Sequence, residues 1–237
     1  MTTWNGRHFE VIGFDADDTL WHSEDSFHVV EARFVELVSP YAPVGVDVAA
    51  ALRATETAQL PIAGYGVKAF TLSMVQAAIT VTDGTVPARV IEQLLEAGMD
   101  MLTETVRLLP HVPEVLADLS RDHRLVLITK GDLVHQTRKV TTSGLAHHFH
   151  HVEVVLEKDV DTYIRILKAI EVPAERFCMV GNSVRSDILP VLSLGAHAFH
   201  VPYPLLWEHE HVDHDEDLDE LASIAELPAR LRAVEAT

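Results

Sequence analysis

The sequence contains a single cysteine, Cys178, in 237 residues, so an internal disulfide framework is excluded. Cys178 lies within an apolar run, which predicts a buried, unreactive thiol and is compatible with a reducing compartment. Basic residues are also few, 18 against 36 acidic ones, and the net charge of −18 argues against nucleic acid and anionic membranes as partners. No apolar run approaches the roughly 20 residues that span a bilayer, and no basic segment followed by an apolar stretch opens the chain. We therefore expect a cytoplasmic protein.

The length allows one large hydrophobic core, or one core with a smaller lobe, and the hydrophobic fraction of 48% is typical of a globular protein. After Pro113, short apolar runs alternate with helical patterns, as in the βαβ units of a parallel sheet. Five strands are expected, from Val11 onward, Arg124 to Ile128, Val152 to Val155, Phe177 to Val180 and Ala196 to Val201. Asp132 and Asp159 are expected to cap the helices that follow two of them. A last helical region is expected around Leu218, Leu221 and Ile224.

The segment between Ser26 and about Arg107 has a different pattern, because its apolar residues recur at helical spacing. Three helices are expected, with apolar residues at Phe27, Val30, Phe34 and Leu37, at Val67, Phe70, Met74 and Ala78, and after Pro87. No strand pattern interrupts this segment. We therefore predict an α/β core of residues 1–20 and 110–237 and a helical lobe of residues 21–109, inserted after the first strand.

The core is organised around Val11 to Leu20, an apolar strand that ends in Asp15, Asp17 and Asp18. In open α/β sheets, ligands bind beyond the carboxyl ends of the strands, so acids at this edge are placed for chemistry. Alternation puts Asp15 and Asp17 on the same side, where two carboxylates repel unless a cation or a shared proton lies between them. The pair suggests a divalent metal with oxygen ligands, with magnesium as the first candidate. The alternative is a polar turn after a strand.

Three later segments complete a set of motifs. Thr129 follows an apolar run, Lys158 lies in the sequence Leu-Glu-Lys-Asp, and residues 181–187 read Gly-Asn-Ser-Val-Arg-Ser-Asp. Together with the Asp-x-Asp-x-Thr sequence at Asp15, these segments resemble, in order, the four motifs of the haloacid dehalogenase superfamily. The resemblance covers most of the chain. It implies a hydrolase with a three-layer, Rossmann-like α/β core, a parallel sheet and an inserted helical cap domain.

The resemblance also implies roles for the motif residues. Asp15 would attack phosphorus and form an aspartyl-phosphate, while Asp17 would protonate the departing alcohol and then activate water. Lys158 would balance the charge on Asp15 and on phosphate. The implied phosphate ligands are Thr129, Lys130, Gly131 and Lys158. The implied function is that of a magnesium-dependent phosphatase acting on a small phosphorylated metabolite.

The implied metal ligands include Asp15 and the backbone carbonyl of Asp17. The chain departs from the superfamily pattern at Asn182, which follows the fourth-motif glycine where family members commonly carry an acid. Asp187 then becomes the expected anionic ligand, and Asn182 would add an oxygen or orient a water molecule. Because a neutral ligand lowers the charge of the site, we expect modest affinity for magnesium.

Other functions of the same superfamily stay open. The dehalogenases that give it its name lack the second aspartate, which is present here as Asp17. A phosphonate hydrolase would need a Schiff-base lysine, for which Lys68 is the candidate in the lobe. A phosphomutase would reuse the same machinery, and a binding protein without activity would result if Asn182 abolished metal binding. Arg53, Tyr65 and Lys68 are candidate substrate contacts, while the substrate itself and the oligomeric state are left open.

Fifteen histidines raise the question of a zinc site. They cluster on both sides of Phe149 and in the acidic run from Glu208 to His214, but neither cluster has the spacing of a structural zinc site with cysteines. Both are expected to be solvated loops. His22, close behind the first motif, is expected on the surface, with the site entrance as the alternative.

Overall fold

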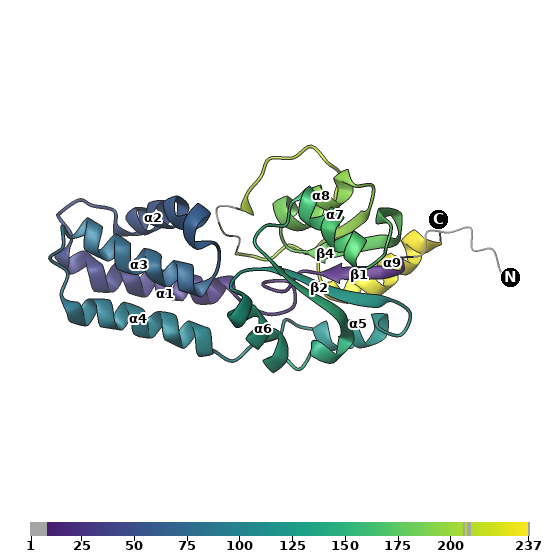
Figure 1. Ribbon diagram of the computed structural model, residues 1–237, viewed down its shortest axis with the longest axis horizontal. Coiled ribbons are helices and arrows are strands. Elements are labelled where there is room, and N and C mark those ends of the chain that lie inside the picture. The colour runs from purple at the N-terminus through teal and green to yellow at the C-terminus, as the bar shows by residue number, and fades with distance from the viewer. Residues whose placement is uncertain (1–8, 206, 208–209, 237) are drawn as a thin grey trace. The chain divides into compact units, whose positions relative to one another are not determined.

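The structure is a computed structural model that describes residues 9–205, 207 and 210–236 (Figure 1). These residues form two compact units. The first contains the chain up to Glu24, the segment Val106–Thr129 and the chain from Gln136 onward, and the second contains residues 25–105 and 130–135. Residues 130–135, which the sequence placed in the core, thus group with the helical unit. Within the described ranges, no helix is both long and apolar enough to span a bilayer.

The first unit contains a six-stranded sheet with the strand order β3-β2-β1-β4-β5-β6. The strands are β1 (Val11–Phe14), β2 (Arg124–Lys130), β3 (Phe149–Val155), β4 (Phe177–Gly181), β5 (His197–His200) and β6 (Asp219–Glu220). The central strand β1 pairs in parallel with β2 and β4, and β5 pairs in parallel with β4 and β6. The predicted α/β fold and all five predicted strands are confirmed. The sixth strand, β6, was missed because two acidic residues carry no apolar pattern.

Helices cover both faces of this sheet. Ile12 and Phe14 of β1 belong to a core shared with α5 (Val112–Leu119), α6 (Leu133–Thr142) and α9 (Leu227–Glu235). Val11 belongs to a second core, shared with α7 (Val160–Ala169) and α8 (Leu189–Ser193). Figure 1 shows α5 and α9 on one face of the sheet and α7 and α8 on the other. The three layers bury β1 on both faces, as expected for a central parallel strand.

The second unit is helical. Its helices are α1 (Glu24–Val38), α2 (Val48–Ala63), α3 (Val67–Val81) and α4 (Ala88–Thr103), which pack around a core of their own. The three helices expected from the sequence correspond to α1, α3 and α4. The helix α2 was missed because only Val48 and Leu52 of its residues are buried, so no continuous apolar stripe marks it.

The predicted position of the last helix is wrong. β6 occupies part of that region, and α9 begins only at Leu227. Leu221 and Ile224 are nevertheless buried in the core, so their spacing reflects a strand end and a short turn rather than a helix. The two predicted helix caps are confirmed, since Asp132 accepts from the backbone of His135 and Asp159 from that of Thr162.

Candidate active site

The loop after β1 brings the acidic residues of the first motif to the carboxyl end of the sheet. The Asp15 amide donates to the Val180 carbonyl at 2.9 Å, and the Ala16 carbonyl accepts from the Leu20 amide at 2.8 Å. Asp18 adopts a left-handed conformation with φ of 62°, which reverses the chain. Its carboxylate accepts from the Ser23 and Glu24 amides at the start of α1, and burial raises its pKa to about 8, with the charge of Asp17 adding to the shift. Asp18 therefore shapes the loop.

Asp15 is buried and has a different partner on each oxygen. Oδ1 accepts from Lys158 Nζ, and Oδ2 accepts from the Thr19 hydroxyl at 3.1 Å. Burial raises the pKa of Asp15 to about 7; the charge of Lys158 opposes this shift, and the charge of Asp187 adds to it. With Asp187 nearby and Lys158 as the counter-ion, the site therefore disfavours a negative charge on Asp15 unless a further cation compensates for it.

Lys158 lies between Asp15 and Asp187. Its Nζ also donates to Asp187 Oδ1 at 2.7 Å, and Asp187 Oδ2 accepts from the Ser183 amide at 3.0 Å. Burial lowers the pKa of Lys158, but the two carboxylates outweigh it and raise the pKa above the ordinary 10.5. Asp187 is fully buried, and a Cβ at Gly181 would lie 2.2 Å from its Oδ2. The fourth-motif glycine thus makes room for the carboxylate that holds Lys158.

Asn182 occupies the other side of Asp15. One terminal atom of its side-chain amide lies 3.3 Å from Asp15 Oδ2, from the Asp17 carbonyl and from Thr19 Oγ1. As the nitrogen, this atom donates to all three oxygens. As the oxygen, it completes with Asp15 and Asp17 a set of oxygen ligands of the kind that magnesium takes, so these residues fit a hard cation. His200 holds the Asn182 backbone, because its ring bridges the Asn182 carbonyl and Glu220 of β6.

Asp17 is held by donors that sequence reasoning missed. Its carboxylate accepts from Trp21 Nε1 at 2.6 Å, from Gln136 Nε2 at 2.8 Å and from Lys139 Nζ at 2.5 Å. Burial raises the pKa of Asp17, but the charge of Lys139 and these hydrogen bonds outweigh it and lower the pKa below the ordinary value. Gln136 and Lys139 are three positions apart on α6, so they share one face of that helix. This spacing after Thr129 was the signal in the sequence that could have identified them.

The predicted phosphate ligands fall into both units. Thr129 is buried in the first unit, where its hydroxyl accepts from Gln136 Nε2 at 3.1 Å. Lys130 and Gly131 group with the second unit, in which the Lys130 ammonium lies 4.5 Å from the centroid of the Tyr65 ring. Lys68 forms an ion pair with Asp132 at 3.0 Å in the same unit.

The histidines form no metal centre in the described part of the chain, which contains no group of three His, Cys, Asp or Glu side chains arranged to hold a metal ion. The rings of His147 and His148 pack against each other with centroids 3.9 Å apart. Glu208 and His209 of the acidic run lie outside the described residues. Nδ1 of His22 lies 2.7 Å from the Tyr203 hydroxyl, so its ring is held by the segment after β5.

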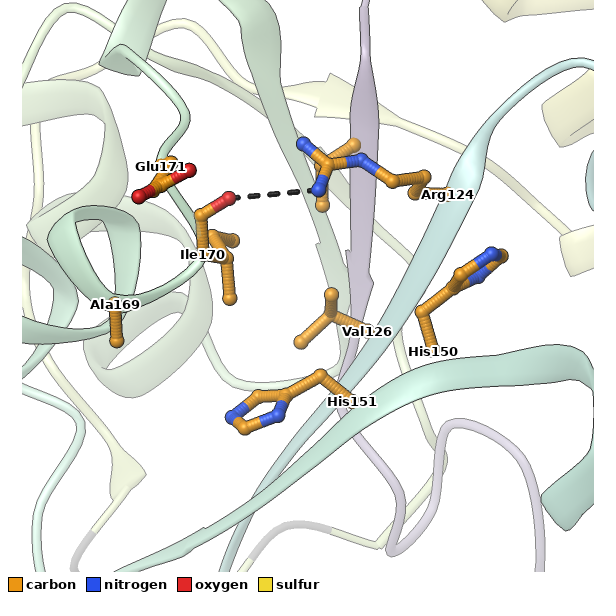
Figure 2. A pocket seen from close by; sticks show the side chains of 8 residues that line it. Arg124, Val126, His150, His151, Ala169, Ile170 and Glu171 are labelled. Atoms are coloured by element: carbon orange, nitrogen blue, oxygen red, sulfur yellow. Dashed lines mark hydrogen bonds between the residues drawn. The ribbon is translucent and has the colours of Figure 1, made fainter.

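A pocket of about 310 Å³ lies at the opposite, amino-terminal end of β1 and β2 (Figure 2). Its walls include Arg124, which donates to the Ile170 carbonyl at 3.5 Å, together with His150, His151 and Glu171. The predicted catalytic residues do not line it. The candidate active site is therefore the constellation at the carboxyl ends of β1, β2 and β4.

Comparisons with known proteins agree on one family. The family model for haloacid dehalogenase-like hydrolases matches residues 9–195. A haloacid dehalogenase-like family hydrolase from Xanthomonas campestris is 42% identical, with a TM-score of 0.88 over 98% of this chain and 94% of that one. A 2-haloacid dehalogenase from Pseudomonas syringae is 20% identical, with a TM-score of 0.65 over 95% and 98% of the two chains. YfnB from Bacillus subtilis, crystallised bound to magnesium, is 16% identical, with a TM-score of 0.65 over 94% and 99%. No curated protein matches the chain.

Proposed function

The chain belongs to the haloacid dehalogenase-like hydrolases, and we propose that within this family it is a magnesium-dependent phosphatase of a small phosphorylated metabolite. The observation that carries the proposal is a pair of carboxylates with separate partners, of which Asp15 is buried and Asp17 is partly buried. Asp15 is held by Lys158 and Thr19, and Asp17 is held by donors of its own. Two carboxylates in different environments suit two different roles, a nucleophile and an acid/base.

In the proposed reaction, an oxygen of Asp15 forms a bond to phosphorus while the bond from phosphorus to the leaving oxygen breaks. Asp17 gives a proton to the leaving oxygen, for which the negative charge of the bound phosphate must first raise the pKa of Asp17 above the lowered value of the free site. It then takes a proton from the water molecule that attacks the aspartyl-phosphate, which releases phosphate and restores Asp15. Lys158 balances the charge on Asp15 and on the phosphoryl group, and the Thr129 hydroxyl donates to a phosphoryl oxygen.

For the metal, we propose Asp15, the Asp17 carbonyl and Asn182 as protein ligands. Asp187 fits this role less well, because it is fully buried against Lys158 and the Ser183 amide, whereas the Asn182 side chain lies 3.3 Å from both Asp15 Oδ2 and the Asp17 carbonyl. A bound magnesium ion would supply positive charge that stabilises the phosphoryl oxygens in the transition state. The excess negative charge of Asp15 and Asp187 over Lys158 favours such a cation. YfnB, which has a similar fold, was crystallised bound to magnesium, and this agrees with the proposal.

Dehalogenation is the competing function within the family, since a fold relative is a 2-haloacid dehalogenase. Asp17 favours the phosphatase, because the attack of an aspartate on a halogen-bearing carbon needs no acid for the leaving halide. A Schiff base at Lys68 is disfavoured, because its ammonium is half exposed and paired with Asp132. A cytoplasmic location belongs to the same proposal and agrees with the single buried cysteine.

The test is hydrolysis of p-nitrophenyl phosphate with magnesium and with a chelator, beside chloride release from 2-chloropropionate. Magnesium-dependent release of nitrophenolate and a phosphate group on the Asp15 peptide after acid quenching are expected. Asp15→Asn should abolish both signals. Chloride release without phosphate turnover would replace the phosphatase by a dehalogenase, and near-normal phosphatase activity in Asp15→Asn would exclude Asp15 as the nucleophile.

A further inference from the structure

The Asp17 carboxylate accepts hydrogen bonds from donors in two separate parts of the first unit. Trp21 belongs to the loop after β1, and Gln136 and Lys139 lie one helical turn apart on α6. Trp21 and Lys139 donate to Oδ1, and Gln136 donates to Oδ2, so both oxygens are directed. The Lys139 ammonium also lies 5.9 Å from the centroid of the Trp21 ring. The three donors therefore contact one carboxylate, and two of them also face each other.

These donors are held firmly by their surroundings. Trp21 is 1% exposed and Gln136 is 3% exposed, while the Lys139 side chain is 13% exposed. Gln136 Nε2 donates to the Thr129 hydroxyl as well as to Asp17, so a single amide joins two residues of the proposed site. Rotation of the Asp17 side chain would break all of these contacts together.

A contribution to stability alone explains this arrangement poorly. Removing a lysine and a carboxylate from water costs free energy, and the attraction between them in this partly buried pair roughly offsets that cost. An acid/base residue, in contrast, must reach the leaving oxygen in one step and the attacking water in the next, and small displacements lower the rate strongly. The orientation of the carboxylate is therefore the property that the three donors determine.

We propose that Lys139 and Gln136 of α6, together with Trp21, are positioning residues that hold the Asp17 carboxylate for its acid/base role. The inference rests on the proposed phosphatase function. It adds to the motif residues a set of donors outside the motifs, of which Lys139 is the most accessible to mutation. Loss of one donor should leave substrate binding intact and slow the steps in which Asp17 takes part.

The kinetic test compares Lys139→Met with Arg138→Met, which removes a neighbouring positive charge from the exposed side of the same helix. With p-nitrophenyl phosphate, nitrophenolate leaves without a proton, so water activation is the step that needs Asp17. Lys139→Met should lower kcat by about 10-fold to 100-fold and lower KM with it, so that kcat/KM stays nearly constant, because only the hydrolysis of the aspartyl-phosphate is slowed. The fraction of enzyme trapped as aspartyl-phosphate by acid quenching should rise. Arg138→Met should match the wild type, and Lys139→Arg should recover most of kcat.

A second readout is independent of activity. The chain contains three tryptophans, so a spectrum of the indole N–H groups has three signals, and the Trp21 signal is assigned by its absence in Trp21→Phe. Because the Trp21 indole donates to Asp17, Lys139→Met and Asp17→Asn should both shift this signal, and Arg138→Met should not. Gln136→Met serves as a second positional variant if Lys139→Met does not fold, and it should show the same kinetic change.

The outcomes separate the two proposals. An active wild-type enzyme in which folded Lys139→Met keeps its kcat and its phosphoenzyme fraction overturns the positioning role and leaves the phosphatase intact. An unchanged Trp21 signal in Lys139→Met overturns the contacts themselves. A wild type that hydrolyses no phosphate ester and carries no phosphate on Asp15 overturns the proposed function, and the positioning role with it, even where the Trp21 signal shifts.

Discussion

Replacing Asp15 by asparagine is expected to stabilise the metal-free protein, and to do so more at alkaline than at acidic pH. Burial raises the pKa of Asp15 from 3.8 to about 7, because the charge of Lys158 compensates only in part while Asp187 adds a like charge. The native state therefore binds the Asp15 proton more tightly than the unfolded chain does. The contribution of Asp15 to the free energy of unfolding therefore falls as pH rises from about 4 to about 7, and it has been lost completely above that range.

The magnitude follows from the shift of the pKa. Each pKa unit corresponds to about 1.4 kcal/mol, so a shift from 3.8 to about 7 costs about 4 kcal/mol once Asp15 is ionised in both states. Near pH 5 the native carboxyl is still protonated, and the cost is only about 2 kcal/mol. Asparagine carries no charge at either pH and keeps an oxygen that can accept from Lys158. Asp15→Asn should thus gain about 2–3 kcal/mol more over the wild type at pH 8 than at pH 5.

The assay is urea unfolding of both proteins at these two pH values in a chelator, repeated with magnesium. A cation at about ten times its dissociation constant adds about 1.4 kcal/mol to the stability of a protein that binds it in the native state. This gain should appear in the wild type and be much reduced in Asp15→Asn, which lacks the proposed anionic ligand. A variant less stable than the wild type at pH 8, or an equal gain at both pH values, would refute the electrostatic reasoning.

Three further outcomes are expected. Asn182→Ala should raise the dissociation constant of magnesium measured by calorimetry, whereas Asp187→Ala should lower kcat with a smaller effect on binding; the reverse order would return the ligand role to Asp187. Gly13→Ala should lower the free energy of unfolding by about 1–3 kcal/mol in urea titrations, because a Cβ there would lie 2.6 Å from the Phe177 ring; unchanged stability would contradict this packing. Asp17→Asn should reduce kcat by about 10²–10⁴-fold, and a smaller loss would indicate that only its carbonyl matters.

The strands were predictable because each buried strand corresponds to a short apolar run in the sequence. Runs such as Leu125 to Ile128 are buried on both faces by the helices of two layers, so the pattern and the burial have the same cause. β6 and α2 lacked such a pattern. β6 consists of two acidic residues that pair with β5 through the backbone. It is a strand because β5 lies beside it, and its own side chains give no strand pattern.

The position of the candidate catalytic residues at the end of β1 could be inferred from the chain alone, because carboxylates that follow a buried parallel strand lie at the sheet edge where ligands bind. The pairing of those residues depends on the folded chain. Lys139 reaches Asp17 across 122 positions of the chain, and Lys158 reaches Asp15 across 143. Asn182 and Asp187 belong to one motif, yet the first faces the Asp17 carbonyl and the second faces Lys158. Local patterns contain no information on such distant pairings, because parallel strands meet only when the sheet forms and their order is set by the packing of the whole core.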